Sequence, residues 1–402
     1  MCALVGKEVV LGVTGGIAAY KACEIVRELV KLRANVHPIL TASGAQFITP
    51  LTLQTLAKNP VVTDLFDLIS ESEIGHISLA QRAHLLLIAP ATANIIGKIR
   101  AGIADDMLST VVMATNAPVL IAPAMNTQMY ASAAVRENME VLKGRGFHFV
   151  EPGEGELACG TVGPGRLADP GTIVEMARIL MTEKILAGRK VVVSAGPTAE
   201  GLDPVRVLTN RSSGKMGFAM ARAARRFGAD VTLVAGPSAL PDPPFMATVR
   251  VRTAAEMMEA VDRAAAGADA VAMCAAVADF RPAQPLPRKI KKENFDRRLE
   301  LVPTVDILAA LGREKGKRKR ILVGFAAETD DLEKNAAAKI RAKKLDAIVA
   351  NDVSRTDIGF GSDDNEVRII FADGETRELP MASKDGIAAG VWRALHAKLM
   401  TR

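Results

Sequence analysis

Apolar residues along this chain alternate between short continuous runs and longer stretches with helical spacing. The first short run covers residues 9–13, and the stretch after it, 17–32, carries apolar residues three and four positions apart. Short runs predict buried strands, and the wider spacing predicts helices with one buried face. Further strands are expected at 36–40, 85–88 and 119–121. This order of strand, loop, helix and strand predicts a parallel sheet covered by helices.

The same order of elements begins a second time near residue 188. A run at 191–193 is followed by a polar loop, a helical pattern after Lys215 and another run at 231–234. Later patterns predict strands at 269–274 and 321–325, a helix at 331–344, a hairpin at 366–379 and a final helix. We therefore predict an α/β protein with two doubly wound, Rossmann-like domains, 1–189 and 190–402, with a helix at 169–186 before the boundary.

The predicted strands of the first domain end in small and hydroxylated residues. The first strand leads into Thr14-Gly15-Gly16, and similar segments start at Thr41, Ala89 and Ala122. In doubly wound folds, ligands bind at the carboxyl edge of the sheet, and small residues there leave room for a flat cofactor. Glycines before a helix let a phosphate approach the unpaired N–H groups at its start. The GxGxxG dinucleotide fingerprint is absent, so the loop at Thr14 alone leaves phosphate binding and an ordinary turn equally open.

Three residues of the first half are candidates for chemistry. His76 stands where a helix begins, and on its own a capping or core role for it is favoured. Asn126 follows a strand, where the alternative is a turn residue. Cys159 lies in a glycine-rich loop, 153–165, that predicts an exposed flap, so an incidental buried thiol is the weaker interpretation.

Composition and charge exclude several classes of protein. The net charge is +6 and aromatic residues make up only 4%, too few for the stacking surfaces of single-strand nucleic-acid binders. A mild positive charge also suits small anionic substrates. No apolar run reaches the ~20 residues needed to span a membrane, and the start of the chain resembles no signal peptide. The four cysteines have no metal-binding spacing, so we expect a cytoplasmic protein with reduced thiols, no membrane association and no nucleic-acid partner.

Four motifs of the first half, in order, resemble those of the flavin-dependent phosphopantothenoylcysteine decarboxylases. They are GVTGGIAAYK, GHISLAQRAHLLLIAPATAN, PAMNTQMY and LACGTVGPGR, and the resemblance covers residues 1–185. It implies a flavodoxin-like domain that binds FMN. One departure is Tyr130, where many relatives have Trp. The FMN contacts assigned on this resemblance fall at the strand ends and are Gly15, Gly16, Ile17, Thr41, Ser43, Thr92, Ala93, Asn94 and Ala124.

The resemblance also implies roles for the three candidates. His76 matches the catalytic histidine, Asn126 and Met129 match the substrate-binding motif, and Cys159 matches the proton-donating cysteine of the flap. Loss of CO2 from a cysteine carboxylate needs an electron sink, which oxidation of the thiol by flavin would provide. A cysteine on a closing flap suits the last proton transfer. Whether His76 orients the substrate or acts as a base stays open.

The second half begins with a loop rich in serine and glycine, Thr209–Gly217, ahead of a helix. It is no P-loop, because GxxxxGK followed by Ser or Thr would need different residues at 209 and 216. The anion-binding logic of such a loop still holds, against the alternative of a capped helix start. The dense cationic run at 313–320 is interpreted as a solvated surface.

Motifs across residues 190–402 resemble the phosphopantothenate–cysteine ligases. They are DPVRVLTNRSSGKMG, AAVADF, KIKK, VGFAAET and ANDVS, so the whole chain resembles the fused bifunctional enzymes of coenzyme A synthesis. The resemblance implies CTP as co-substrate, Mg2+ as helper with ligands that the sequence does not reveal, and 4'-phosphopantothenate and cysteine as substrates. It implies catalytic or intermediate-handling roles for Arg206, Asn210 and Lys289. Nucleotide contacts are expected at Ala275, Asp279, Phe325, Lys339 and Lys343, with Lys289 also facing the phosphates.

Homo-oligomers are implied as well, with trimeric contacts between decarboxylase domains and dimeric contacts between ligase domains, up to a dodecamer. Two other functions stay open at this point. A nicotinamide-dependent dehydrogenase would fit the α/β pattern, but the missing GxGxxG argues against it. A flavoprotein-like regulatory subunit without catalysis could dispense with His76 and Cys159, yet both are present.

Overall fold

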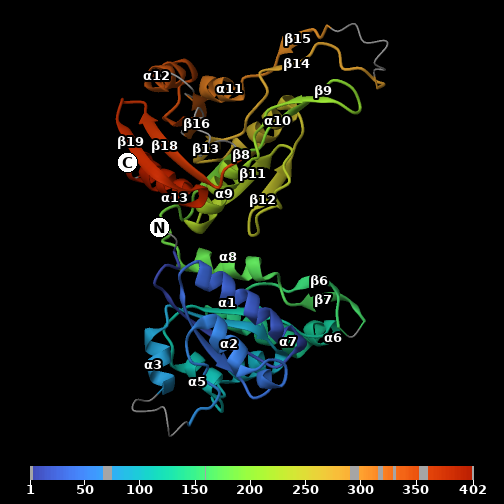
Figure 1. Cartoon of the computed structure of the whole chain (residues 1–402), viewed down its shortest axis with the longest axis vertical. Helices are drawn as coiled ribbons and strands as arrows, with labels where there is room; N and C mark the ends of the chain where they lie inside the picture. The colour runs from blue at the N-terminus through green and yellow to red at the C-terminus, as the bar shows by residue number, and fades with distance from the viewer. Residues whose placement is uncertain are drawn as a thin grey trace. The chain divides into compact units, whose positions relative to one another are not determined.

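A computed structural model describes residues 3–66, 75–158, 160–289, 298–315, 320–328, 332–352 and 361–400. The chain divides into two compact units, Met1–Thr182 and Glu183–Arg402, which are described separately below (Figure 1). Within the described residues, no helix combines the length and the apolar character that a membrane span requires.

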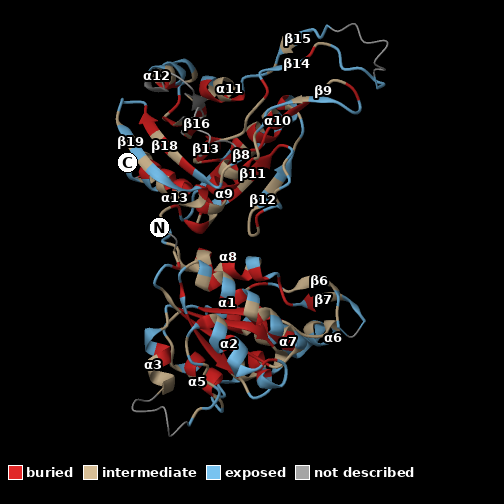
Figure 2. Cartoon of the chain, viewed as in Figure 1, coloured by how far each residue is buried: buried red, intermediate tan, exposed pale blue. Residues whose placement is uncertain are grey.

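The first unit is built on a parallel sheet with the strand order β2-β1-β3-β4-β5. The strands are β1 (Glu8–Val13), β2 (Asn35–Leu40), β3 (Leu85–Ala91), β4 (Val119–Pro123) and β5 (His148–Phe149). Strands β1, β3 and β4 are buried almost throughout, as their continuous apolar runs predict (Figure 2). This strand order is the flavodoxin-like one, whose switch point lies between β1 and β3.

Helices cover both faces of this sheet. Helix α1 (Ala22–Lys31) packs against α2 (Pro50–Ala57) and α8 (Pro170–Met181). On the other face, α3 (Gly75–Arg82), α4 (Ala93–Ala101), α5 (Met107–Ala114) and α7 (Ala133–Gly144) share one buried cluster with residues of β1 and β3. The short elements are η1 (Ile17–Lys21), η2 (Gly44–Gln46) and α6 (Thr127–Ala131).

Two sequence-based expectations for this unit need correction. The predicted helix 17–32 is a 3-10 turn, η1, followed by α1, so the chain tightens just after the glycine loop. The glycine-rich segment 153–165 is not a plain loop, because β6 (Gly153–Glu156) and β7 (Val162–Arg166) pair as an antiparallel hairpin. Several of its glycines adopt positive φ, which allows this pairing without side-chain clashes.

The second unit contains an eight-stranded sheet with the order β12-β11-β8-β13-β16-β17-β18-β19. Its parallel strands are β8 (Lys190–Ala195), β11 (Asp230–Ala235), β12 (Ala247–Arg250), β13 (Ala270–Met273), β16 (Ile321–Glu328) and β17 (Ala347–Asp352). Counted along the chain, these six follow the Rossmann order 3-2-1-4-5-6, with the switch point between β8 and β13. The predicted C-terminal hairpin is confirmed as β18 (Asp364–Phe371) and β19 (Thr376–Ser383), which run antiparallel.

Helices again lie on both faces. Helices α9 (Lys215–Arg226) and α13 (Lys384–Leu395) share one buried cluster, in which the Trp392 Nε1 group donates to the Met220 carbonyl at 2.9 Å. Helices α10 (Ala254–Ala265), α11 (Ile307–Glu314) and α12 (Leu332–Lys343) cover the other face, and the π-helical turn His396–Met400 follows α13. Two small antiparallel hairpins project from the loops, β9 (Ala199–Gly201) with β10 (Val207–Thr209) and β14 (Phe280–Pro282) with β15 (Leu301–Pro303).

Candidate active sites at the two sheet edges

The loops that follow β1 and β3 are joined at the switch point of the first sheet. The Thr14 hydroxyl, which is 3% exposed as a residue, donates to the Pro90 carbonyl at 2.7 Å. The same oxygen accepts from the Thr92 N–H at 3.1 Å, and the Thr92 side chain caps α4 by accepting from Ile95 N–H. The two loops therefore hold each other in a fixed geometry at the place where this strand order binds its ligands.

A third loop, the one after β2, approaches the first through a glycine. A Cβ atom at Gly15 would lie 2.4 Å from the Ser43 Cβ atom, a distance that real side chains do not tolerate. At the neighbouring Gly16, by contrast, the nearest atom would be Thr92 Cγ2 at 4.0 Å. The contacts with Ser43 and Thr92 bring the ends of β1, β2 and β3 together, so the predicted flavin contacts from these loops share one edge.

This edge fits the group that the sequence motifs imply. It offers hydroxyls from Thr41, Ser43 and Thr92, glycine backbone at the start of η1, and the apolar side chain of Ile17, which is 60% exposed. Hydroxyls and glycine N–H groups suit a phosphate, and an exposed apolar side chain suits a flat ring. Ala124 belongs to the same edge, because its N–H donates to the Ala91 carbonyl at 2.9 Å.

The β6–β7 hairpin lies over the segment that follows β4. The Met125 N–H donates to the Gly165 carbonyl at 2.9 Å, and a Cβ atom at Gly165 would meet the Met125 oxygen at 2.3 Å. Asn126 caps α6, with its Oδ1 accepting from Gln128 N–H at 2.8 Å. Asn126, Met129 of α6 and the hairpin are therefore neighbours, while Cys159, between the two hairpin strands, lies outside the described residues.

His76 is the second residue of α3, the helix that precedes β3. Because a crossover helix runs antiparallel to its strands, the start of α3 lies toward the carboxyl edge of the sheet. The Nδ1 atom of His76 is buried and has no hydrogen-bond partner among the described residues. Buried polar atoms are almost always paired, so this atom marks a place where a bound molecule would complete the site.

In the second unit, the switch point is closed by the ends of β8 and β13. The Ser194 hydroxyl accepts from Ala275 N–H at 3.1 Å, and the Gly196 carbonyl accepts from Ala276 N–H at 2.9 Å. Helix α9 starts close to this edge, because a Cβ atom at Gly217 would lie 2.5 Å from the Ala195 Cβ atom. A glycine at this place allows the helix to pack tightly against the first strand of the sheet.

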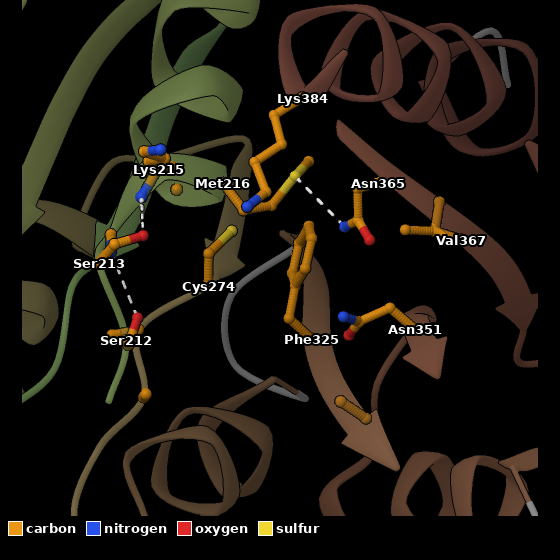
Figure 3. Close-up of a pocket in the computed structure, with 15 residues that line it drawn as sticks. Ser212, Ser213, Lys215, Met216, Cys274, Phe325, Asn351, Asn365, Val367 and Lys384 are labelled. Atoms are coloured by element: carbon orange, nitrogen blue, oxygen red, sulfur yellow. Dashed lines mark hydrogen bonds between the residues drawn. The ribbon is translucent and has the colours of Figure 1, made fainter. Parts of the chain in front are cut away.

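A cavity of about 180 Å³ opens beside this switch point (Figure 3). It is lined by the Ser212–Gly217 segment, by Cys274, Ala275 and Ala276 after β13, by Phe325 and Ala326 of β16, and by Asn351, Asn365, Val367 and Lys384. Figure 3 shows the Phe325 ring between Cys274 and Asn351 in this view. The lining thus combines hydroxyl and amide groups with one aromatic ring, as nucleotide sites do.

The structure brings some predicted ligase residues to this cavity and leaves others apart from it. Ala275 and Phe325 line it, and Asn210 lies beside it, with its Nδ2 donating to the Ala276 carbonyl at 3.0 Å. The Arg206 guanidinium contacts Asp203, with its Nε donating to Oδ2 at 2.9 Å.

Four further predicted residues are not among those that line the cavity. Lys343 pairs with Asp306 at 2.8 Å, Lys339 and Asp279 are exposed, and Lys289 is exposed in the segment between β14 and β15. Burial raises the pKa of Asp306, but the hydrogen bonds from Lys343 and from the N–H of Ala309 lower it. The lowering outweighs the effect of burial, so the pKa of Asp306 lies below its usual value. Sequence reasoning missed Lys384 and Asn365, whose local sequence shows only a helix start and a strand.

Comparisons with known proteins match the two compact units of the chain to two different family models. The family model "Flavoprotein" matches residues 3–181, and the model "DNA/pantothenate metabolism flavoprotein C-terminal domain" matches residues 186–399. The "Coenzyme A biosynthesis bifunctional protein CoaBC" of Bacillus subtilis is 50% identical over 382 residues, which is 94% of each chain. Its namesake in Escherichia coli K12 is 47% identical over 386 residues, 95% of each chain. The chain belongs to the CoaBC family.

Two solved structures are also similar to parts of the chain. A CoaBC C-terminal domain is 40% identical, covers 55% of this chain and all of its own, and has a TM-score of 0.47. The FMN-dependent cysteine decarboxylase SpaF is 30% identical, covers 44% of this chain and 98% of its own, and has a TM-score of 0.40.

Membership of the CoaBC family confirms the function that the motifs predicted. The chain is a bifunctional enzyme of coenzyme A biosynthesis, a phosphopantothenate–cysteine ligase and a phosphopantothenoylcysteine decarboxylase. The flavoprotein match to its first unit supports a flavin cofactor. The predicted fold class, two α/β units of which the first is flavodoxin-like, is confirmed as well.

Proposed function

We propose that the two CoaBC reactions are divided between the two sheet edges. The edge formed by Gly15, Ser43 and Thr92 holds FMN and decarboxylates phosphopantothenoylcysteine. The edge formed by Ala275 and the cavity beside it holds CTP and makes phosphopantothenoylcysteine from 4'-phosphopantothenate and cysteine. The observation that carries this proposal is that each unit has its own switch point, closed by hydrogen bonds between the ends of two parallel strands.

In the first unit, bound FMN supplies the electron sink that loss of CO2 from the cysteinyl carboxylate requires. His76, whose Nδ1 atom is buried without a hydrogen-bond partner among the described residues, orients the substrate or takes its thiol proton. Asn126 and Met129 bind the substrate beneath the β6–β7 hairpin. Cys159, which lies between β6 and β7 in the sequence, donates the proton in the reduction of the enethiolate intermediate to 4'-phosphopantetheine, for which bound FMN would return the electrons that it took up.

In the second unit, the carboxylate of 4'-phosphopantothenate attacks the α-phosphorus of CTP, and pyrophosphate leaves. The amine of cysteine then displaces CMP from the acyl-cytidylate and forms the amide. Lys289 stabilises the negative charge that grows on the phosphates, and Asn210 and Arg206 hold the acyl group. Lys339 and Lys343, together with Asp279, contact the nucleotide.

Mg2+ would be held largely by the phosphates of CTP. Among the described residues, no group of three or more His, Cys, Asp or Glu side chains is arranged to bind a metal ion. Mg2+ commonly binds through substrate phosphates, one or two carboxylates and water rather than through a protein cage. We also propose that the enzyme is cytoplasmic and assembles as a homo-oligomer through trimeric contacts of the first unit and dimeric contacts of the second.

Two variants of the full chain test the division of labour. With Lys289→Gln, acyl-cytidylate and phosphopantothenoylcysteine should not form, whereas added phosphopantothenoylcysteine should still be decarboxylated. With Cys159→Ser, the ligase should run normally, and an oxidised, decarboxylated intermediate should accumulate. Mass spectrometry distinguishes the products. Full turnover by Cys159→Ser, or normal acyl-cytidylate formation by Lys289→Gln, would remove that residue from its role.

A further inference from the structure

A hydrogen bond joins helix α6 to the segment that leads into the β6–β7 hairpin. The Tyr130 hydroxyl, on α6, donates to Glu151 Oε2 at 2.6 Å. Glu151 lies between β5 and β6, two residues before the first hairpin strand begins. The aromatic ring of Tyr130 packs against the buried cluster of the first unit. Tyrosine thus presents an apolar ring to the core and a polar hydroxyl to the start of the hairpin.

Glu151 is held from its other side by helix α7. Its Oε1 atom accepts from Lys143 Nζ at 3.1 Å, and Lys143 Nζ lies 5.7 Å from the centre of the Phe149 ring. Burial raises the pKa of Glu151, but the hydrogen bonds from Tyr130 and Lys143 lower it to below its usual value, so the carboxylate is ionised at neutral pH. Burial and the bond to this carboxylate both raise the pKa of Tyr130, which keeps its hydroxyl protonated. The bond is therefore charge-assisted, the stronger kind.

The hairpin and α6 lie side by side in the first unit (Figure 1). On the side of β7, the Met125 N–H donates to the Gly165 carbonyl, and a Cβ atom at Gly163 would lie 2.9 Å from Thr127 Cγ2. On the side of β6, the bond from Tyr130 reaches the residue that precedes the strand by two positions. Contacts with α6 and the residues just before it therefore hold the hairpin at both of its strands.

We propose that Tyr130 and Glu151 are positioning residues of the decarboxylase site, which hold α6 at a fixed place relative to the β6–β7 hairpin. Helix α6 carries the substrate-binding Met129, and the connection between the two hairpin strands carries the proton donor, Cys159. The proposal rests on the proposed function of the first unit, from which both of these roles come. A misplacement of about 1 Å in an active site can cost ~100-fold in rate, even when its cause lies away from the reacting atoms.

Two substitutions remove the bond from its two ends. Tyr130→Phe keeps the ring and removes the hydroxyl, and Glu151→Ala removes the acceptor. In the full chain loaded with FMN, each should lower kcat/KM for phosphopantothenoylcysteine about tenfold, the effect of one lost charge-assisted hydrogen bond. The double variant should be about as slow as the slower single variant, because both changes break the same bond. Glu151→Gln keeps an oxygen acceptor for the hydroxyl and should retain most of the activity.

Glu140→Ala is the matched control. Glu140 Oε1 accepts from the same lysine, Lys143, at 3.0 Å, and the Glu140 side chain is 71% exposed. This variant removes a carboxylate from Lys143 but leaves the bond between Tyr130 and Glu151 in place, so decarboxylation should match that of wild type. Ligation by the second unit, measured on the same samples, should be unchanged in every variant.

Two readouts separate a positioning role from a merely structural one. In anaerobic single turnovers, wild type should end with oxidised flavin, because the two electrons taken from the substrate return to the enethiolate. If the hairpin is misplaced, part of the decarboxylated enethiol leaves before this reduction, and each molecule released leaves one flavin reduced. Mass spectrometry and flavin absorbance measure the two amounts. Partial unfolding would lower the yields of enethiol and 4'-phosphopantetheine together and leave their ratio unchanged.

The second readout needs no flavin. Amide hydrogens of residues 153–166 in the flavin-free chain should exchange faster in Tyr130→Phe than in Glu140→Ala, because the hairpin has lost one of its contacts.

Two outcomes overturn the positioning role and leave the function of the unit standing, provided that wild type forms 4'-phosphopantetheine. One is a Tyr130→Phe protein with the wild-type rate, product ratio and hairpin exchange. The other is a slower Tyr130→Phe protein whose product ratio and hairpin exchange match those of wild type, which indicates a structural role alone. If the wild-type chain with FMN forms no 4'-phosphopantetheine from phosphopantothenoylcysteine, the proposed function of the first unit falls, and the positioning role falls with it.

Discussion

Replacement of Gly15 by alanine should separate two loops of the flavin edge. The new Cβ atom would lie 2.4 Å from Ser43 Cβ and 2.9 Å from the Ser43 carbonyl carbon and oxygen. Carbon atoms normally approach to about 3.5–4.0 Å, so one loop must move by about 1 Å. Overpacking of this kind costs about 1–3 kcal/mol. For a unit of this size, a loss of about 2 kcal/mol lowers the melting temperature by roughly 4–8 °C.

Calorimetry of the full chain measures this effect. The transition that shifts upward when flavin is added belongs to the unit that binds flavin, and it is this transition that Gly15→Ala should lower. Flavin affinity, followed by fluorescence, should fall about tenfold, because a loop displaced by ~1 Å loses at least one hydrogen bond to the ligand.

The matched control is Gly144→Ala, at the end of α7, where a Cβ atom meets nothing within 4 Å. This variant should melt at or slightly above the wild-type temperature and bind flavin normally. A Gly15→Ala protein that melts within about 1 °C of wild type and binds flavin with unchanged affinity would refute the close approach between the two loops and its role in the site.

Three further changes probe the two sheets. Thr14→Val removes the hydroxyl that joins the first switch-point loop to Thr92, and should lower the unfolding free energy of the first unit by about 1–3 kcal/mol in denaturant titrations; an unchanged midpoint would contradict this. Gly217→Ala should destabilise the second unit by a similar ~1–3 kcal/mol, since its Cβ would lie 2.5 Å from that of Ala195, and a normal melting curve would argue against it. Asp306, whose pKa is lowered mainly by Lys343 against the effect of burial, adds stability above its ordinary value of 3.8 and loses it as pH falls through the folded pKa. The difference in unfolding free energy between wild type and Asp306→Asn should therefore be constant near neutral pH and shrink in acid. A difference that grows in acid would contradict the stabilising effect of the ionised Asp306 carboxylate.

The strand ends were predictable because the sequence signal is local. Continuous apolar runs mark β1 and β3, and the residues after them, Thr14 and Thr92, necessarily reach the same edge of a parallel sheet. What the runs could not show is that the Thr14 hydroxyl donates to the Pro90 carbonyl, because that bond joins residues 76 positions apart in the sequence. The small hairpins escaped prediction for a related reason: strands such as Ala199–Gly201 are too short to show alternation.

Lys384 illustrates the limit most clearly. In the sequence it is one cation at the start of a helix, and solvated lysines are the usual outcome at such positions. Its burial depends on the packing of α13 against α9, fixed by the hydrogen bond from Trp392 to the Met220 carbonyl, 172 positions away. A charged residue that is buried by contacts far away in the sequence leaves no local pattern. Ala275 and Phe325, by contrast, lie in recognisable motifs, and both line the cavity.

The central claim is that one chain holds two separate phosphate-binding sites, with flavin chemistry in the first unit and CTP chemistry in the second. The most direct measurement is mass spectrometry of the reaction of the purified chain with 4'-phosphopantothenate, cysteine, CTP and Mg2+, after removal of flavin and again after its return. The account predicts phosphopantothenoylcysteine, CMP and pyrophosphate without flavin, and 4'-phosphopantetheine once flavin is restored. Decarboxylated product without flavin, or ligation without CTP, would contradict it.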